Sequence, residues 1–288
     1  MYKRKLCLGL SDAFGDYNEQ ISLIKDAGFD AIFTPWHKDA PLEKWVKTAK
    51  ECSLEIQSVH APFNKTDDLW DTDEEKINIA YNELIDCIHD CERNGVPIMV
   101  SHAFIGFDSD LKPNEAGLER YNGLIKEAEK CGVKIAFENT EGEEFLRMIL
   151  DNFADGKTCG FCLDTGHEMC YNYSKNLLAD YGKYLFSTHI NDNLGISDYN
   201  GRIYWTDDLH LLPFDGIKDW DDFAQRLALC NYTDILTFEL NKKSKPGRHE
   251  NDIYDRMNIE DYLSQAYIRA CKVAALCERA LNKQQRGN

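Results

Sequence analysis

Short apolar runs alternate with amphipathic stretches along the whole chain, and this alternation limits the possible folds more than any other feature. Eight runs have the length of strands: 5–10, 31–34, 56–61, 97–102, 134–139, 159–164, 185–192 and 234–240. Apolar residues recur at helical spacing between them, which is typical of repeated βα units. Eight such units in 288 residues predict a (β/α)8 TIM barrel of the α/β class. A doubly wound open sheet is the structural alternative.

Several short signals predict where helices begin and end. Thr72 and Glu75 have the spacing of a capping box at a helix start. Asn94-Gly95 and Cys131-Gly132 stand where helices are expected to stop, since glycine accepts the left-handed conformation that ends a helix. The last helix is expected over residues 259–281, where apolar residues recur at helical spacing.

The domain organisation is predicted to be simple, because no linker rich in Pro, Gly or Ser divides the chain. We expect a single barrel domain over residues 1–281 and a polar C-terminal tail over residues 282–288. The longest irregular stretch, 193–215, follows the seventh predicted strand. A loop of this length inside a compact domain is usually functional or disordered.

Composition excludes several classes of protein. The formal charge of −17 argues against a chain that mainly grips nucleic acid or anionic lipid, since those partners need a basic face. The sequence contains no window of about 18 consecutive apolar residues, so no membrane span is expected. Eleven cysteines without an export signal indicate reduced thiols in the cytoplasm rather than a disulfide framework. Cys159 and Cys162 have CxxC spacing, but they lie in a predicted strand, which argues against a redox pair.

Polar residues gather at the carboxyl ends of the predicted strands. In a TIM barrel these ends open onto one face, where active sites lie. Strands three to eight end on histidines and acids: His60, His102, Glu138, Asp164, His189 and Glu239. His167 follows Asp164 by three residues, and Asp208 and His210 lie in the long loop after the seventh strand.

Taken together, these residues indicate a divalent metal site. A single histidine or glutamate at a strand end is more often an ordinary hydrogen-bonded or solvated residue. Several carboxylates buried together are costly, however, unless cations compensate them. Imidazole with carboxylate is the ligand set that zinc, manganese, iron or cobalt accepts.

Six segments carry a resemblance to a known family: 58–63, 137–142, 162–167, 188–192, 208–220 and 238–240. They read SVHAPF, FENTEG, CLDTGH, THIND, DLHLLPFDGIKDW and FEL. The chain resembles the xylose isomerase-like TIM barrel superfamily, which contains sugar and sugar phosphate isomerases and epimerases and also endonuclease IV. The resemblance extends from the first strand to the eighth and is specific for fold and metal site rather than for substrate.

The isomerase or epimerase branch implies one set of roles. Glu138, Asp164, His189 and Glu239 would hold one divalent ion (Zn, Mn, Co or Mg). Glu138 and Glu239 would move a proton α to a carbonyl as a base and acid pair. Substrate contacts are expected from residues that line the mouth or offer a cationic clamp: His167, His60, His102, Trp36, Arg202 and Lys242. Trp36 has an equally good interpretation as a core residue at the barrel rim.

The endonuclease IV branch implies a different metal count. Three zinc ions would be held, with His60, His102 and Glu138 around one of them. The second would use the four ligands named above, and the third His167, Asp208 and His210. The ligand set alone favours this alternative of phosphodiester hydrolysis at abasic DNA.

Charge and loops favour sugar chemistry over DNA cleavage. DNA binding draws much of its affinity from Lys and Arg, whereas this chain is acidic. The loop after His210 lacks a glycine-rich run, and the loop at 35–40 is short. We therefore expect a small polar sugar-like substrate, and no nucleic acid or membrane partner; a homo-oligomer stays open. A keto-polyol dehydratase is a further alternative. A binding module that has lost its site is disfavoured, because no ligand position is replaced.

Overall fold

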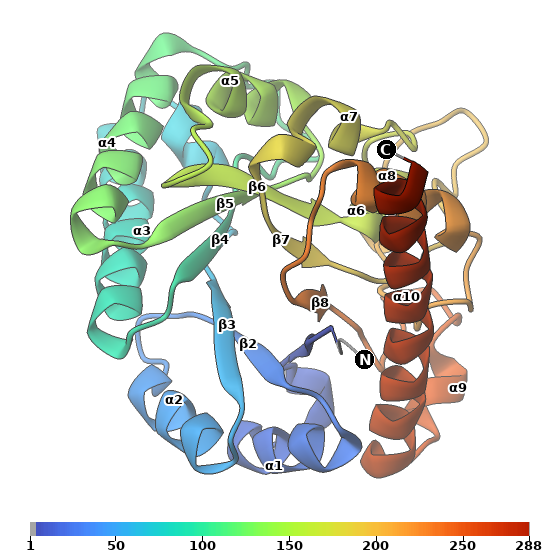
Figure 1. The fold of residues 1–288 in the computed structure, drawn as a ribbon. Coiled ribbons are helices and arrows are strands. Elements are labelled where there is room, and N and C mark those ends of the chain that lie inside the picture. The colour runs from blue at the N-terminus through green and yellow to red at the C-terminus, as the bar shows by residue number, and fades with distance from the viewer. Residues whose placement is uncertain (1–3, 288) are drawn as a thin grey trace.

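The structure, a computed structural model, describes residues 4–287 and contains eight parallel strands (Figure 1). Residues 1–3 of the predicted domain and residue 288 of the predicted tail lie outside the described part. The strands are β1 (Leu6–Gly9), β2 (Ala31–Pro35), β3 (Glu55–His60), β4 (Ile98–His102), β5 (Lys134–Glu138), β6 (Cys159–Asp164), β7 (Leu185–His189) and β8 (Leu236–Phe238). Each coincides with one of the predicted strands, with ends that shift by a few residues.

The strand order identifies the architecture. The sheet runs β7-β6-β5-β4-β3-β2-β1-β8, so each strand neighbours the next one in sequence. Ile190, directly after β7, forms a parallel bridge with Phe238 of β8, and the Ile190 N–H donates to Thr237 O at 2.8 Å. This contact brings the two ends of the sheet together in a (β/α)8 TIM barrel. The doubly wound alternative is excluded, because its strand order would reverse at a switch point.

Helices surround the barrel, as Figure 1 shows. They are α1 (Tyr17–Ala27), α2 (Leu42–Glu51), α3 (Glu74–Asn94), α4 (Glu115–Cys131), α5 (Glu143–Phe153), α6 (Thr165–Cys170), α7 (Leu177–Tyr181), α8 (Trp220–Leu229), α9 (Asp252–Asp255) and α10 (Ile259–Gly287). Single turns of 3-10 helix lie at Asp12–Phe14, Asp67–Trp70, Gly182–Tyr184 and Trp205–Asp207. The last of these interrupts the predicted long loop. The main apolar core lies between the strands and the helices that cover them.

Helix ends follow the predicted signals with two corrections. Gly95 and Gly132 cap α3 and α4 in the left-handed conformation, as predicted. The predicted capping box at Thr72 is wrong by one residue, because the cap of α3 is Asp73. Its carboxylate accepts the N–H groups of Glu75 and Lys76, and a charged acceptor satisfies two free donors at a helix start.

The second correction concerns the C-terminus. The chain was predicted to leave the helix at Leu281, but α10 continues to Gly287. The intervening residues are Asn, Lys, Gln, Gln and Arg, and most of them are good helix formers. Asn282 also donates its side-chain N–H to Glu278 O at 2.7 Å, one turn earlier. The polar tail is therefore part of the helix as far as residue 287.

The interior of the barrel forms a floor beneath the carboxyl ends of the strands. The ring of Phe33 stacks on the imidazole of His189, with centroids 4.7 Å apart. A Cβ atom at Gly9 would come within 2.5 Å of the Phe33 ring, so the neighbouring strand needs glycine here. Phe33 thus occupies the barrel axis and supports the side chains that open onto the mouth.

Two sequence predictions about class are also addressed by the described residues. No helix between residues 4 and 287 is long and apolar enough to cross a membrane. The cysteines of this part of the chain are free thiols, and Cys159 and Cys162 are both buried in β6, as predicted for a strand pair rather than a redox motif.

Candidate metal centre

Strand register brings the first group of predicted ligands together. His102 pairs with Glu138 across β4 and β5, and Asp164 pairs with His189 across β6 and β7. His189 Nδ1 lies 3.0 Å from Glu138 Oε1 and 3.0 Å from Glu239 Oε2. With Asp164, these three residues place one ligand atom each within 4.8 Å of the others. The four residues meet as the sequence predicts.

Two further histidines approach the same glutamate from the other side. The Nε2 atoms of His60 and His102 lie 3.3 Å and 3.4 Å from Glu138 Oε2. Each oxygen of Glu138 therefore faces a different set of donor atoms. Such a carboxylate is suited to bridge two cations.

The long loop after β7 completes a third group. Asp208 Oδ2 lies 2.6 Å from His210 Nε2 and 3.5 Å from His167 Nε2. His210 has a φ of 48°, in the left-handed region that a residue with a side chain rarely adopts. This backbone turn directs its ring to Asp208, and such strain is found mainly at functional sites.

The imidazole rings are oriented as in metal-binding histidines. The Nδ1 atoms of His60, His167 and His210 are hydrogen-bonded to the backbone carbonyls of Ala61, Asn139 and Glu239, at 2.8, 3.0 and 3.1 Å. A carbonyl only accepts, so Nδ1 carries the proton in each ring. The Nε2 atoms face the carboxylates, so each could offer its lone pair to a cation that replaces the Nε2 proton. The outer hydrogen bond at Nδ1 is the usual partner of a ligating histidine.

The electrostatics of the cluster fit a bound cation. Glu138, Asp164 and His189 are fully buried. Burial alone would raise the pKa of Glu138, but the neighbouring His189 holds this pKa well below its usual range. Conversely, burial would lower the pKa of His189, yet Glu138 and Glu239 raise it well above its usual range. Glu138 Oε2 is buried without a hydrogen-bond partner. A field that favours positive charge this strongly suits a divalent ion.

Two asparagines support Asp164, and their roles were not predicted. Asn191 Nδ2 donates to Asp164 Oδ2 at 2.8 Å. The Asn139 side chain pairs with the Asp164 backbone, accepting its N–H at 2.7 Å and donating to its carbonyl at 2.9 Å. Asn139 directly follows Glu138, and Asn191 comes two residues after His189. This closeness to predicted ligands is the signal in the sequence that could have identified them.

The cluster opens into a cavity of about 190 Å³, which we call the inner cavity. Its walls include His60, His102, His167, Asp208, His210 and Glu239. Lys245 also lines it, with Nζ 3.3 Å from Asp208 Oδ2. This lysine belongs to the basic segment after β8, where the sequence analysis selected Lys242 instead.

Three predicted substrate contacts lie elsewhere. Trp36 is buried in the core and donates its indole N–H to Asp90 at 2.7 Å, so the core interpretation is correct and the sugar-packing one is wrong. Lys242 is also buried, and its ammonium donates to the carbonyl of Asp255 at 2.8 Å, which ties the β8 loop to α9. Arg202 lines a different cavity, described below. A strand-end position alone does not fix where a long side chain points.

The fold and the clustered ligands define the class of barrel to which this chain belongs. The xylose isomerase-like TIM barrel family matches residues 21–258. The chain is therefore a member of that family.

Comparisons with individual proteins agree with this assignment. The uncharacterized protein y4fM of Sinorhizobium fredii is 26% identical over 294 residues, covering 87% of this chain and 90% of that protein. The structure of IolI protein with a binding zinc atom is similar with a TM-score of 0.74 and 20% identity, over 94% of this chain and 98% of that one. The structure of L-ribulose 3-epimerase is similar with a TM-score of 0.73 and 16% identity, over 99% of this chain and 98% of that one. At these identities the two structures show the fold.

Proposed function

We propose that this protein is a divalent-metal-dependent isomerase or epimerase of a sugar or sugar phosphate, with Glu138 and Glu239 as its proton-transfer pair. The observation that carries the proposal is the position of these carboxylates, each 3.0 Å from His189 Nδ1 and drawn from strands β5 and the end of β8. The structural similarity to sugar epimerases supports the substrate class.

The residues of the chain divide the work between holding a cation and moving a proton. Glu138, Asp164, His189 and Glu239 would hold the ion, with zinc, manganese, cobalt or magnesium as candidates. When bound, a divalent ion polarises adjacent substrate oxygens and makes the proton α to a carbonyl more acidic. One glutamate then takes this proton. For isomerisation the other returns a proton to the neighbouring carbon, and for epimerisation it returns a proton to the opposite face of the same carbon.

The walls of the inner cavity supply binding and orientation. His167 and Lys245 line the cavity, where the Lys245 ammonium can donate a hydrogen bond to one substrate hydroxyl and the His167 imidazole can bond to another. Phe63, Phe107 and Trp205 line the same space and limit access of water to the enediolate that proton removal generates. An enediolate that is held in place is reprotonated, which gives isomerisation or epimerisation. An enediolate that expels its β-hydroxyl gives dehydration instead.

The test is exchange of a substrate hydrogen with solvent. Zinc- or manganese-loaded protein in deuterium oxide should incorporate deuterium at the carbon next to the carbonyl of a ketose. The Glu239→Gln variant should lose exchange by about 10²–10⁴-fold, the usual contribution of a general acid or base. Glu43→Gln, on the exposed face of α2, is the matched control. Absence of exchange with a broad ketose panel, in fully metal-loaded protein, would refute the proposal.

One observation favours a second candidate, hydrolysis of a phosphoester. His167, Asp208 and His210 form a separate ligand group, and Glu138 joins His60 and His189 in another. Several clustered cations would activate water and stabilise a leaving oxygen. Cleavage of bis(p-nitrophenyl) phosphate and nicking of an abasic duplex would show this activity. The acidic composition disfavours the duplex as substrate.

A further inference from the structure

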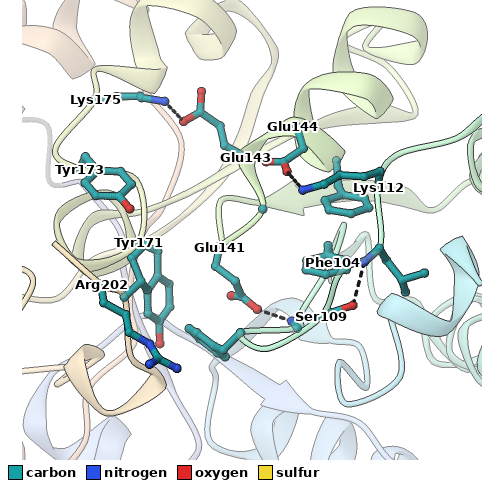
Figure 2. Close-up of a pocket in the computed structure, with 16 residues that line it drawn as sticks. Phe104, Ser109, Lys112, Glu141, Glu143, Glu144, Tyr171, Tyr173, Lys175 and Arg202 are labelled. Atoms are coloured by element: carbon teal, nitrogen blue, oxygen red, sulfur yellow. Dashed lines mark hydrogen bonds and ion pairs between the residues drawn. The ribbon is translucent and has the colours of Figure 1, made fainter. Parts of the chain in front are cut away.

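A second, larger cavity of about 450 Å³ adjoins the inner cavity. We call it the outer cavity; Figure 2 shows its lining. Phe107, Glu141 and Tyr171 line both cavities. The rings of Phe107 and Tyr171 meet edge to face at 5.3 Å, so they form the boundary between the two spaces. The two cavities therefore lie on either side of the same three residues.

Glu141 lies at the junction with one carboxylate oxygen unused. Its side chain is only 6% exposed, and Oε1 accepts the Gly106 N–H at 2.6 Å. Its other oxygen, Oε2, is buried and has no hydrogen-bond partner. Burial raises the pKa of Glu141 to about 7, so the carboxyl can both donate and accept near neutral pH. An unpartnered buried carboxyl oxygen is costly, and a ligand hydroxyl would satisfy it.

The charges around the outer cavity are already paired. Lys175 Nζ lies 2.6 Å from Glu143, and Lys112 Nζ lies 3.8 Å from Glu144, as Figure 2 shows. Arg202, which was predicted as an anion clamp, lies 3.2 Å from Asp108. Since each of these cations has a carboxylate partner, the cavity favours an uncharged polar group over a phosphate or carboxylate.

Aromatic side chains line the outer cavity. Phe104 stacks on Phe145 at 3.9 Å with nearly parallel planes, and this buried pair forms an apolar wall. Tyr173 stands at the rim and is 58% exposed, so its ring is accessible to a ligand in the outer cavity. Tyr173 and Ser174 both have left-handed backbones, with φ of 54° and 56°, a conformation that residues with a side chain rarely adopt. The fold holds Tyr173 at the rim in this conformation.

We propose that the outer cavity binds a second, uncharged sugar ring, so that the natural substrate is a glycoside whose reacting unit occupies the inner cavity. The inner cavity is smaller than the usual range of about 300–1,000 Å³ for ligand pockets, whereas the two together lie within it. Apolar C–H faces of the second ring pack against the aromatic side chains, and its hydroxyls bond to Glu141. That the reacting unit is a ketose rests on the proposed function. Tighter binding of a two-ring sugar can be measured whether or not the protein converts it.

The test uses ligands that differ only in what the fructose unit carries. D-Fructose is compared with its glucosyl derivatives turanose, maltulose and isomaltulose, and with fructose 6-phosphate. Dissociation constants are measured by calorimetry on the full-length, metal-loaded protein. The variants are Tyr173→Ala at the rim, and Glu141→Ala with Glu141→Gln as its conservative partner. Tyr199→Ala is the matched control, because Tyr199 is fully exposed and lies outside both cavities.

We expect at least one glucosyl-fructose to bind about tenfold or more tightly than fructose and fructose 6-phosphate. Tyr173→Ala should remove this advantage without changing the affinity for fructose, because Tyr173 lines only the outer cavity. Glu141→Ala should weaken the binding of the disaccharide more than that of fructose, whereas Glu141→Gln should retain most of the advantage. Equal affinities, no binding of any disaccharide, preference for the phosphate, or an advantage that survives Tyr173→Ala would overturn the inference. Deuterium exchange on fructose without a disaccharide advantage would refute only the glycoside inference. A disaccharide advantage without exchange on any ketose would refute only the proposed function.

Discussion

Asn191 donates its side-chain N–H to Oδ2 of Asp164 at a distance of 2.8 Å. The other oxygen of Asp164 accepts the backbone N–H of His167 at 2.6 Å. Asp164 ends β6 and Asn191 follows β7, so the hydrogen bond crosses between neighbouring strands. The carboxylate is thus held at both oxygens before any cation binds.

Loss of this support should weaken metal binding. Partners of this kind contribute to affinity by fixing the ligand, and their removal typically costs about 10–100-fold. We therefore expect Asn191→Ala to raise the dissociation constant for zinc by that factor, measured by competition with a chromogenic chelator. Asn152→Ala, on the exposed end of α5, should leave the affinity unchanged. Equal affinities of Asn191→Ala and the unaltered protein would show that Asn191 has no such role.

Glu168 should matter for stability rather than for chemistry. Its side chain is buried and lies 3.0 Å from Lys218 Nζ and 2.8 Å from Arg226 Nη1. Neutralisation of Glu168 leaves the buried Lys218 without its carboxylate, while Arg226 keeps its pair with Asp222; a broken buried pair of this kind costs about 3–5 kcal/mol. We expect Glu168→Gln to lower the free energy of unfolding in urea by this amount. Glu51→Gln, which removes an exposed pair with Lys47, should change it by less than about 1 kcal/mol. If Glu168→Gln lowered the free energy of unfolding by no more than Glu51→Gln does, the prediction would be contradicted.

Asp155 should contribute a pH-dependent part of the stability. Burial works to raise the pKa of Asp155, but hydrogen bonds from the N–H groups of Lys157, Thr158 and Cys159 hold this pKa below its usual range. The folded protein therefore binds the proton less tightly than the unfolded chain. The contribution is complete above the unfolded pKa of about 3.9 and is lost as the pH falls through the lower folded value.

The measurement compares melting temperatures between about pH 6 and about pH 3. Asp155→Ala should be less stable than the unaltered protein at the higher pH, and the gap should narrow as the pH falls. Asp155→Asn keeps an oxygen acceptor but cannot titrate, so its melting temperature should lose the Asp155 part of the pH dependence. A gap that is constant across this range would refute the assignment.

The fold was predictable because it depends on periodicity along the chain. Eight apolar runs and the intervening helical spacing specify strands and helices, and the helix stops at Gly95 and Gly132 need only local backbone freedom. The start of α3 at Asp73 and the end of α10 at Gly287 were less predictable. Adjacent polar residues compete for the cap, and a polar sequence with good helix propensity gives no stop signal.

The clustering of the proposed metal ligands was predictable for a related reason, and the directions of the longer side chains were not. Glu138, Asp164 and His189 stand at strand ends, which a barrel brings to one face whatever the loops do. Trp36 and Lys242 also stand near strand ends, yet their side chains pair with Asp90 and with the carbonyl of Asp255. Those partners come from distant parts of the chain. The direction of a long side chain is therefore decided by tertiary contacts that the sequence pattern does not contain.

Metal removal should destabilise the protein. Glu138, Asp164 and Asp208 are buried, and the cluster favours positive charge. A cation that binds only the folded state adds about 2.7 kcal/mol of stability when its concentration is 100 times the dissociation constant. Dialysis against a chelator should lower the melting temperature, and added zinc or manganese should restore it. Glu138→Gln should respond less to either treatment. A melting temperature that is indifferent to both treatments in the unaltered protein would contradict the metal site.

Two lysines three residues apart should have opposite phenotypes. Lys245 lines the inner cavity beside Asp208, whereas the Lys242 ammonium donates to the carbonyl of Asp255 away from that cavity. We expect Lys245→Met to lower kcat/KM for the ketose by about tenfold, through loss of one charged hydrogen bond to substrate. Lys242→Met should retain kcat/KM within about twofold but should melt at a lower temperature, because it removes the hydrogen bond that ties the β8 loop to α9. The reverse pattern, with activity lost in Lys242→Met and kept in Lys245→Met, would restore the original sequence-based choice of Lys242 as the clamp.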